Sequence, residues 1–522
     1  MISPAPLLAP ISLVVGAIIL AFTSLWTREK RVYDGLAVMF TLVSLGLTLY
    51  TFMLVQQPGS VVVYGSGGWP PPLGIVYVVD KFSAVMGVTA AAIMFLVVLY
   101  SIGYLGDNGK PRALYYVVML LLGAAVEAIF YTGDLFNFFV MIELMAVTAY
   151  GLVAYRKDKG VAVEASIKYG IAACLAGIVL FVGVGFIYAY MGTLSMPDLA
   201  AKLNNISTPM SYFSGVQASS ITPVILILSL ILWPLLLESA VFPLHFWLPD
   251  AHSEALSPVS AVLSGLVVNA GLYGVARLLY SVFGAVHSTM SSLGIVMTVL
   301  IIVGILGAFY SSIRMLVEKD VKRVIAFSTV LHMSYITIGI GLGTAAALTA
   351  VMYHFLAHAV SKTLAFLSIG ILVAAAGSRR LDDLRGYARY YPGVVAATIL
   401  AMLGLAGVPP LGTFPSKLLL IQASIGSGQI VAAGTIVVTS AIAAVAYFRI
   451  IDRLINKKPS RASYLGSSIT TRTVLLLLCI GVVAIGLFMP VIYHYLEGAS
   501  ILASNPAWYS STVEKILRLF GL

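Results

Sequence analysis

The stretch LESAVFPLHFWLPD, residues 237–250, decides the fold of this chain. It lies in an apolar region, yet it combines the acidic Glu238 and the basic His245 with the helix breakers Pro243 and Pro249. In hydrocarbon, a broken backbone survives only where protein or a water-filled cavity satisfies its freed N–H and C=O groups. A carboxylate at membrane depth is costly and is by default a functional-site hypothesis. The stretch therefore predicts a polar path through a membrane protein.

The composition of the whole chain agrees with a membrane location. The 522 residues are 60% hydrophobic and only 10% charged, which indicates a polytopic membrane protein and excludes a soluble one. Since a spanning helix needs about 20 apolar residues, the sequence predicts an all-α fold with about 14 transmembrane helices. The two cysteines, Cys174 and Cys479, lie in apolar segments without CxxC spacing, which disfavours disulfide scaffolds, iron–sulfur ligation and thiol redox chemistry.

The basic residues gather in alternate loops of this predicted arrangement. Most of the 30 Lys and Arg residues fall in clusters near residues 28–31, 110–112, 156–159, 314–323, 379–389 and 449–472. The positive-inside rule then places these loops in the cytoplasm and both termini outside, in a prokaryotic cell membrane. The net charge of +10 thus reflects orientation, and no nucleic-acid partner is expected.

Buried ionisable residues form a candidate path. Glu143 lies about 13 Å along its helix from Asp134, a predicted helix cap, and gluing two helices is its alternative role. His354, His358 and Lys362 recur every four residues on one helix face, a stripe that suits proton relay. His332 either extends this relay or is a hydrogen-bonded core histidine. Two more intramembrane residues are Lys168 and Glu127, and for Glu127 a polar boundary position is the alternative.

A second broken stretch matches the first. GLAGVPPLGTFPSKLLL (404–420) contains Pro409, Pro410 and Pro415 beside Lys417, as Pro234, Pro243 and Pro249 accompany Glu238. Paired broken helices at corresponding positions are typical of inverted repeats in transporters, although kinks tolerated for packing alone are the alternative. The predicted division is 1–112 (helices 1–3), 113–285 (helices 4–8), 286–455 (helices 9–13) and 456–522 (a last transmembrane helix and a short amphipathic C-terminus).

Two outer loops carry local signals. The Gly/Pro-rich loop 56–79 is expected to form a short cap or hairpin, and Pro197 with Asp198 predicts a small amphipathic helix.

Five blocks carry a family resemblance: DLFNFFVMIEL (134–144), FPLHFWLPDAHSEALSPVSAVLSGL (242–266), DVKRVIAFSTVLHMSY (320–335), HFLAHAVSKTLAFLSIG (354–370) and GLAGVPPLGTFPSKLLL. They resemble the antiporter-like membrane subunits shared by respiratory complex I (NADH:quinone oxidoreductase), Mrp cation/proton antiporters, whose D subunit is nearest, and membrane-bound hydrogenases. The resemblance implies two inverted five-helix repeats with broken helices 7 and 12, two half-channels, and a central Glu/His/Lys axis that moves protons or exchanges Na⁺ for H⁺. Glu143, Lys362 with His358, and Lys417 match family positions.

Two positions depart from the family pattern. Glu238 stands where a lysine is usual in helix 7, and Asn269 where a lysine is frequent in helix 8. If Glu143 and Glu238 lie close together, a proton or a transient Na⁺ is shared between them, because two adjacent carboxylates cannot both ionise cheaply. A cation site, a retuned proton store and an inactive first half-channel remain open.

The resulting hypothesis is an ion-translocating subunit without bond chemistry or a cofactor of its own. Its expected partners are other antiporter-like and redox membrane subunits, which would carry any iron–sulfur clusters, the lipid bilayer, H⁺ and Na⁺. The alternatives are a stand-alone Na⁺/H⁺ antiporter, a structural subunit and a quinone-reacting oxidoreductase subunit. The predicted translocation residues are Glu143, Glu238, His332, His358, Lys362 and Lys417, supported by Glu127, Lys168, His245, Asn269 and His354.

Overall fold

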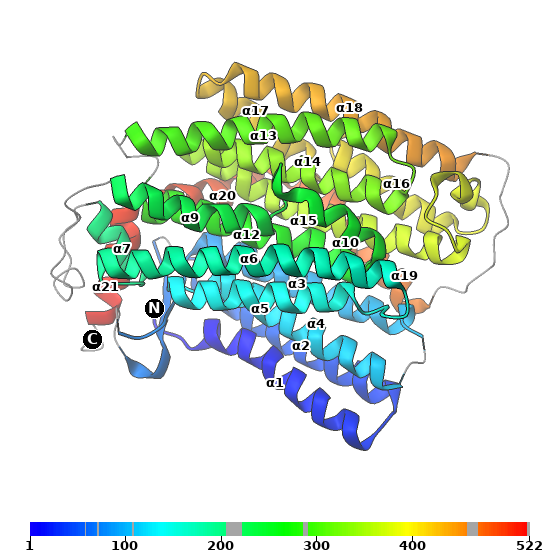
Figure 1. The fold of residues 1–522 in the computed structure, drawn as a ribbon, viewed down its shortest axis with the longest axis horizontal. Helices are drawn as coiled ribbons and strands as arrows, with labels where there is room; N and C mark the ends of the chain where they lie inside the picture. Colours follow the sequence, from blue (N-terminus) through cyan, green and yellow to red (C-terminus); the bar gives the residue numbers. More distant parts are fainter. Residues whose placement is uncertain are drawn as a thin grey trace.

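The computed structural model describes residues 1–57, 59–69, 73–106, 109–204, 222–284, 291–456 and 468–518. Most of them form helices that run side by side along the longest axis of the molecule (Figure 1). Within this described part, 12 helices are long and apolar enough to cross a membrane, which confirms the all-α polytopic fold. Two shorter apolar helices, Leu226–Glu238 and Pro392–Ala406, occupy the segments predicted to be broken, and the total of about 14 spans stays a prediction.

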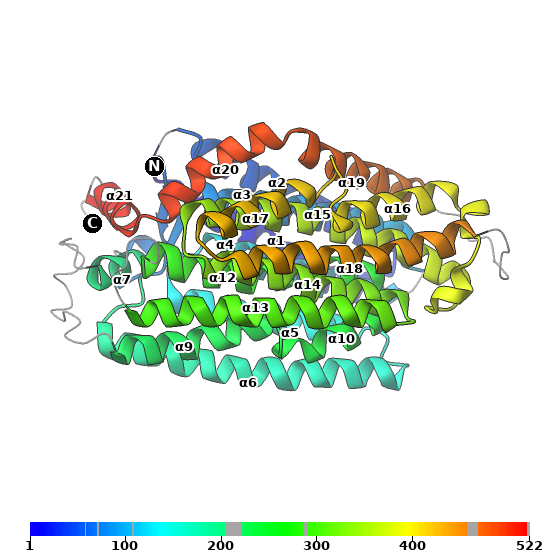
Figure 2. The same ribbon diagram turned by 90° about the horizontal axis from the view of Figure 1, so that it is seen from above.

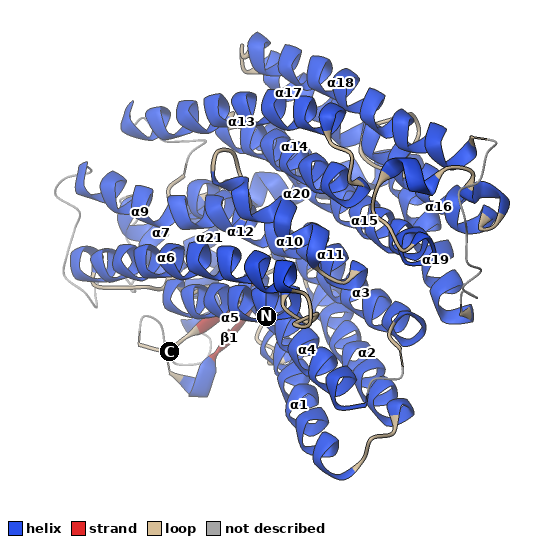
Figure 3. Cartoon of the chain, turned by 45° about the vertical axis from the view of Figure 1, so that its right-hand side comes forward, coloured by secondary structure: helices blue, strands red, loops and turns tan. Residues whose placement is uncertain are grey.

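The N-terminal part packs four helices beside a small hairpin. Its helices are α1 (Ala5–Trp26), α2 (Lys30–Leu54), α3 (Lys81–Tyr104) and α4 (Gly109–Tyr131), and its other elements are β1 (Val62–Gly65), η1 (Ser66–Gly68) and β2 (Val76–Val79). The strands pair antiparallel with Val62 opposite Val79, which confirms the predicted hairpin (Figure 3). The N-terminus and the last described residues, 506–518, lie at the same end of the bundle as this hairpin (Figure 1).

The next part contains the first broken helix. Its elements are α5 (Leu135–Val153), α6 (Gly160–Met191), α7 (Met196–Leu203), α9 (Thr222–Glu238), η2 (Leu244–Trp247), α10 (Leu248–Glu254), α11 (Ser257–Val262), η3 (Leu263–Val267), α12 (Val268–Ala276) and η4 (Arg277–Val282). The run from α11 to η4 forms one candidate span, in which η3 and η4 are π-helical. Helix α7 confirms the small helix predicted at Pro197, and its residues are buried.

The last part contains the second broken helix. Its elements are α13 (Ser291–Val317), α14 (Val321–Gly341), α15 (Ala345–Ala376), η5 (Leu381–Leu384), η6 (Tyr387–Arg389), α16 (Pro392–Ala406), α17 (Phe414–Gly426), α18 (Ile430–Ile455), α19 (Ile469–Leu487), α20 (Met489–Ala503) and α21 (Pro506–Arg518). The predicted last transmembrane helix is divided, because Pro490 lies in the first turn of α20 and cannot continue a helix.

Helix α15 is the centre of the bundle. It contacts α3, α11, η3, α14, α16, α17, α19 and α20. Viewed from above, α6 and α13 run along one flank and α19 and α20 along the other (Figure 2). A stripe of ionisable residues on α15 is therefore shielded from lipid by its neighbours.

The first break lies between α9 and η2. Pro234 lies inside α9 without ending it, so the prediction that this proline interrupts the helix is wrong. The helix ends at Glu238, and Ala240 adopts a left-handed conformation with φ 50°. The indole nitrogen of Trp247 donates to the carbonyl of Leu237 at 3.0 Å, and this bond satisfies a carbonyl group freed by the break.

The second break lies between α16 and α17. Helix α16 ends at Ala406 and is capped by Gly407, whose φ of 85° is a conformation that glycine adopts without strain. Two side chains from the next helical segment satisfy the freed carbonyls: Thr413 Oγ1 donates to Gly404 O at 2.7 Å, and Lys417 Nζ donates to Leu405 O at 3.0 Å. Each break is thus closed by side chains that follow it in the sequence.

Candidate functional site

Glu238 lies at the first break and is almost completely buried. Tyr169 of α6 donates a hydrogen bond from its hydroxyl to Glu238 Oε2 at 3.0 Å, whereas Oε1 has no hydrogen-bond partner among the described residues. The ring of Tyr169 stacks on Trp247 with centroids 3.8 Å apart. The segment after the break therefore positions the tyrosine that holds the carboxylate.

Two more buried polar atoms in this half of the molecule are unpaired. Asn269 donates from Nδ2 to Gly265 O at 2.8 Å, but its Oδ1 has no partner in the part of the chain that the structure describes, and the same holds for Ser239 Oγ. Asn269 belongs to α12, which packs on α9. Buried polar atoms are nearly always paired with protein or water, so Glu238 Oε1 and Ser239 Oγ, which belong to consecutive residues, fit bound water or a cation.

Glu143 is only half-buried, on the flank formed by α5 and α6. Its carboxylate lies against Gly177, where any Cβ would collide with it. Within the described ranges, no hydrogen bond or ion pair joins Glu143 to Glu238. Glu143 belongs to α5 and Glu238 ends α9, and α6 packs against both helices.

A hydrogen-bonded histidine pair connects α14 with the second break. His332 Nδ1 lies 2.9 Å from His354 Nε2, and His354 Nδ1 lies 2.8 Å from the hydroxyl of Ser416. Ser416 immediately precedes Lys417 in α17. His332 and His354 are fully buried, so this chain of polar groups crosses three helices inside the protein.

His358 and Lys362 extend the row along α15. The ring of His358 lies 5.3 Å from that of His332, and neither of its nitrogens has a hydrogen-bond partner in the described structure. Lys362 Nζ donates to the carbonyl of Ile325 at 2.8 Å and to the hydroxyl of Ser328. All of these donors and acceptors come from α14 and α15. The four-residue spacing predicts that His358 and Lys362 share one face of α15.

Lys417 completes the row at the second break. Its ammonium donates to the carbonyls of Leu405 and Ala406, both at 3.0 Å, and lies 5.6 Å from the ring centroid of Tyr335. A cation at the C-terminal end of α16 also interacts favourably with the helix dipole. Its position therefore serves the local fold as well as any ion path.

Three further residues of the predicted set lie apart from this row. His245 packs against Phe242 and Tyr310, with ring centroids 5.6 and 4.8 Å away. Lys168 is about half exposed and pairs with Glu164 at 2.8 Å. Glu127 is fully buried, and it accepts hydrogen bonds from the Ser44 hydroxyl of α2 at 2.8 and 2.6 Å. Glu127 thus joins α2 to α4.

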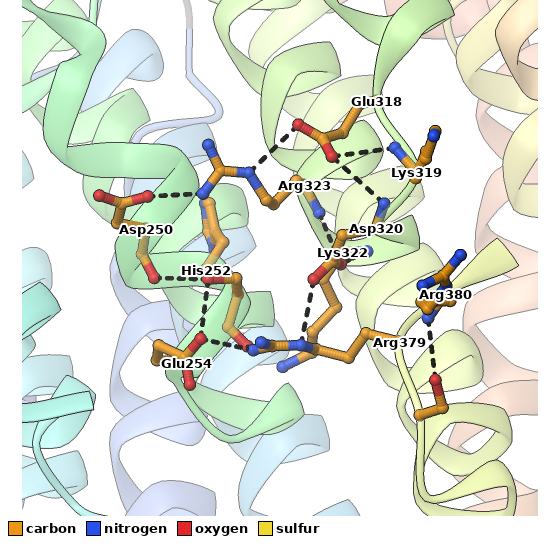
Figure 4. Close-up of polar contacts among 12 residues, drawn as sticks. Asp250, His252, Glu254, Glu318, Lys319, Asp320, Lys322, Arg323, Arg379 and Arg380 are labelled. Atoms are coloured by element: carbon orange, nitrogen blue, oxygen red, sulfur yellow. Dashed lines mark hydrogen bonds and ion pairs between the residues drawn. The ribbon is translucent and has the colours of Figure 1, made fainter. Parts of the chain in front are cut away.

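An ion-pair network closes one end of the bundle, which we call the basic end, where Arg156, Arg323 and Arg379 lie. Asp250 of α10 pairs with Arg323 at 2.6 Å, and Glu254 pairs with Arg379 at 2.7 Å (Figure 4). Lys168 also pairs with Asp250, at 3.2 Å. The segment after the first break is thereby tied to the start of α14 and the end of α15.

Two carboxylates of this network lie between α13 and α14 and have opposite pKa shifts. Burial raises the pKa of Asp320, although Arg379, at 3.0 Å, opposes this effect. For Glu318, burial also acts to raise the pKa, but hydrogen bonds from the Asp320 and Lys319 backbone N–H groups and the charge of Arg323 outweigh it and lower the pKa. The network therefore holds Glu318 charged.

The arrangement suits ion transfer between side chains. Among the described residues, no group of three or more His, Cys, Asp or Glu side chains is placed to hold a metal ion. Several important partners were missed from the sequence: Tyr169, Ser328 and Ser416. Of these, only Ser416 carried a signal, because it stands beside Lys417 in the broken stretch.

Comparison with known proteins places this geometry among membrane subunits. The family model described as "NADH:quinone oxidoreductase/Mrp antiporter, TM" matches residues 132–443. NADH-quinone oxidoreductase subunit N of Desulforudis audaxviator (strain MP104C) is 33% identical over 393 residues, which are 74% of each chain. The putative antiporter subunit mnhD2 of Staphylococcus aureus (strain JH9) is 27% identical over 519 residues, 98% of each chain. A chain of the membrane-bound sulfane sulfur reductase, an archaeal respiratory membrane complex, superposes with a TM-score of 0.88 at 29% identity, covering 98% of this chain and 100% of that one.

Proposed function

Because the chain belongs to the NADH:quinone oxidoreductase/Mrp antiporter membrane family, we propose that it is the ion-translocating membrane subunit of a multisubunit respiratory or Mrp-like complex. One observation carries this proposal. A row of buried basic groups runs from Lys362 through His358 and His332 to His354, which is joined by a hydrogen bond to Ser416, the residue before Lys417. A row of this kind costs folding free energy and is retained in membranes mainly for function.

The proposed mechanism is stepwise proton transfer along this row. A proton received by Lys362 passes through water to His358, whose two unpaired nitrogens can accept and release it. His332 and His354, joined at 2.9 Å, then relay it towards Lys417. Each transfer needs only rotation of a side chain or a water molecule, because the neighbouring groups lie on the same face of α15 or face it from α14 and α17.

The first half of the molecule is proposed to set which ion is coupled. Glu238 has one carboxylate oxygen without a partner among the described residues, and the next residue in the chain, Ser239, has an unpaired hydroxyl oxygen. Oxygen atoms of this kind bind a hard cation such as Na⁺. Without a cation, the carboxyl group can hold a proton instead. Coupling to Na⁺ is therefore the second candidate function. In that case Glu238 binds the cation, whereas in a chain that moves only protons this position would need a base that binds and releases a proton.

The remaining architecture follows from the proposal. Residues 113–285 and 286–455 act as two inverted repeats, and the basic end faces the cytoplasm, so both termini lie outside. The half-exposed Glu143 then marks the flank where a neighbouring subunit would continue the ion path.

The experiment compares two variants of Lys417 in the assembled complex. In Lys417→Ala both the charge and the helix cap are lost, whereas Lys417→Gln keeps an N–H donor for the carbonyls at the end of α16. We expect both to reduce ion-coupled activity at least about tenfold, a change of about 1.4 kcal/mol in the barrier. Glu143→Ala is expected to behave likewise, and Lys110→Ala, on the exposed side of α4, serves as the control.

Ion uptake into membrane vesicles and native gel electrophoresis measure coupling and assembly separately. Full coupling in Lys417→Gln with loss only in Lys417→Ala would mean that Lys417 is a helix cap and not part of the path. Transport by the chain expressed alone in antiporter-deficient vesicles would instead favour a stand-alone antiporter.

A further inference from the structure

His252 of α10 is a fully buried histidine that the row described above does not include. Neither of its ring nitrogens has a hydrogen-bond partner among the described residues. Its ring stacks on Phe366 of α15, with centroids 4.7 Å apart and planes inclined by 22°. A buried imidazole without any partner is rare in proteins, and it needs either water or a functional explanation.

The position of Phe366 places His252 at the end of the row on α15. His354, His358, Lys362 and Phe366 follow one another at four-residue intervals, so they share one face of the helix. His252 lies against the last of them, one turn beyond Lys362 in the direction of the basic end. The charged groups that act on His252 are those of Lys362 and Lys322.

A cavity at the basic end extends to the residue next to His252 in the chain. It has a volume of about 490 Å³ and is lined by Ser253, Ala255, Lys322 and Arg379 among others. Ser253 directly follows His252, and Lys322 Nζ donates to the carbonyl of Ala255 at 2.6 Å. Arg156, which also lines the cavity, is exposed, so the cavity opens to the surface. Figure 4 shows His252 among the ion-paired side chains of this end.

We propose that His252 is a proton-relay residue that connects water in this cavity with Lys362, so that the row on α15 receives protons from the basic end without passing Glu238. The inference rests on the proposed function. An excess proton carried by the cavity water binds one ring nitrogen and leaves neutral water behind. The other ring nitrogen then releases its proton to the neutral amine of Lys362, which becomes an ammonium, and exchange of the ring tautomer restores the starting state. Lys322 holds the backbone of Ala255 and keeps the cavity polar at this point.

The test uses two substitutions of His252 in the assembled complex in membrane vesicles. His252→Ala leaves a space of the size of the ring, whereas His252→Phe fills that space and keeps an aromatic ring on Phe366. We expect both to reduce ion-coupled proton uptake at least tenfold. Imidazole added at the basic end should restore uptake in His252→Ala but not in His252→Phe. His494→Ala, which removes an exposed histidine of α20, is the matched control and should keep wild-type uptake.

The outcomes separate this inference from the proposed function. If Lys417→Ala abolishes uptake while His252→Ala retains it, His252 is not a relay residue and the proposed function stands. If both variants retain uptake, the proposed function fails as well. Loss of uptake in both His252 variants without any recovery by imidazole, with assembly intact on a native gel, would assign His252 a structural role and overturn the inference.

Discussion

At the residue scale, Glu238 gives this chain its distinctive chemistry. Among the described residues, its carboxylate accepts one hydrogen bond, from Tyr169, and its other oxygen has no partner. The sequence identified Glu238 as a departure from the family pattern. It could not identify Tyr169, because a tyrosine in an apolar helix gives no sign of which neighbouring helix its hydroxyl will face.

Replacing Glu238 by lysine tests whether this position selects the ion. An ammonium group in the same place repels a bound Na⁺, so we expect Glu238→Lys to weaken the apparent Na⁺ affinity of coupled transport by about tenfold or more, equivalent to about 1.4 kcal/mol. Glu238→Gln, which has nearly the same size and no charge, is the control for packing. Na⁺ titration of transport in vesicles measures the change. An unaltered Na⁺ dependence in Glu238→Lys would mean that the first half does not set the ion.

The histidine row shows what spacing can and cannot predict. Four-residue spacing was sufficient to place His354, His358 and Lys362 on one buried face of α15. The contact between His332 and His354 was not predictable, because the relative height of two helices depends on packing that no local pattern encodes. For the same reason, the position of Lys417 in a break could be predicted, but its hydrogen-bond partners could not.

At the element scale, the ends of helices determine where the charged groups lie. Asp134 caps α5 by accepting a hydrogen bond from the backbone N–H of Asn137 at 2.8 Å, which confirms the cap predicted from the sequence. Helix α5 carries Glu143 two and a half turns further along. A defined first turn thus fixes the position of Glu143 relative to α6.

The charge of Asp134 has a predictable cost. Burial raises the pKa of Asp134 to about 6, although hydrogen bonds from the Asn137 and Phe136 backbone act to lower it. An unfolded aspartate titrates near 3.9, so between about pH 4 and 6 the folded chain binds the proton more tightly, and stability falls as the pH rises through this window. We expect Asp134→Asn, which keeps a capping side chain, to flatten this dependence and to stabilise the protein at pH 7 by at most about 3 kcal/mol.

Thermal unfolding of the purified protein at several pH values checks this prediction. If Asp134→Asn unfolded with the same pH dependence as the wild type between pH 4 and 6, another group would be responsible for it.

At the scale of the whole molecule, a buried ion pair joins three separate parts of the chain. Arg277 of η4 donates to both carboxylate oxygens of Asp80, at 2.6 and 2.7 Å, and lies 5.5 Å from the ring centroid of Tyr509 in α21. Burial acts to raise the pKa of Asp80, but the charge of Arg277 and the hydrogen bonds to the carboxylate outweigh it and lower the pKa. The start of α3, the end of the α11–η4 run and the C-terminal helix are thereby held together.

Breaking this pair on one side should destabilise the whole fold. Arg277→Met leaves a buried carboxylate without its cation, and we expect a loss of about 3–5 kcal/mol in the free energy of unfolding. Adding Asp80→Asn removes that charge and still accepts the hydrogen bond from the Ser83 backbone that caps α3, at 2.9 Å in the wild type. The double variant should therefore recover part of the loss, as measured by the midpoint of thermal unfolding. A double variant no more stable than Arg277→Met would mean that the arginine acts through packing alone.

Much of the architecture could be predicted from composition and periodicity. The apolar spans, the hairpin at 56–79 and the breaks around Pro243 and Pro409 all depend on local sequence, and each appears in the structure. The exact point of a break was less predictable: Pro234 remains inside α9 because neighbouring groups can compensate for one missing N–H. In the ion-pair network at the basic end, Asp250 pairs with Arg323 and Glu254 with Arg379, far apart in the chain, and a single sequence does not reveal such pairs.

The complete enclosure of two spans has a consequence for how the protein is made. The run Ser257–Val282 and helix α14 are buried along their whole apolar windows, and they are among the less hydrophobic of the 12 candidate spans. Segments that never touch lipid in the finished protein need little affinity for it, and their polar side chains make solitary entry into the bilayer costly. Their neighbours must therefore accompany them out of the translocon, so biogenesis of this chain is expected to release helices in groups and not one at a time.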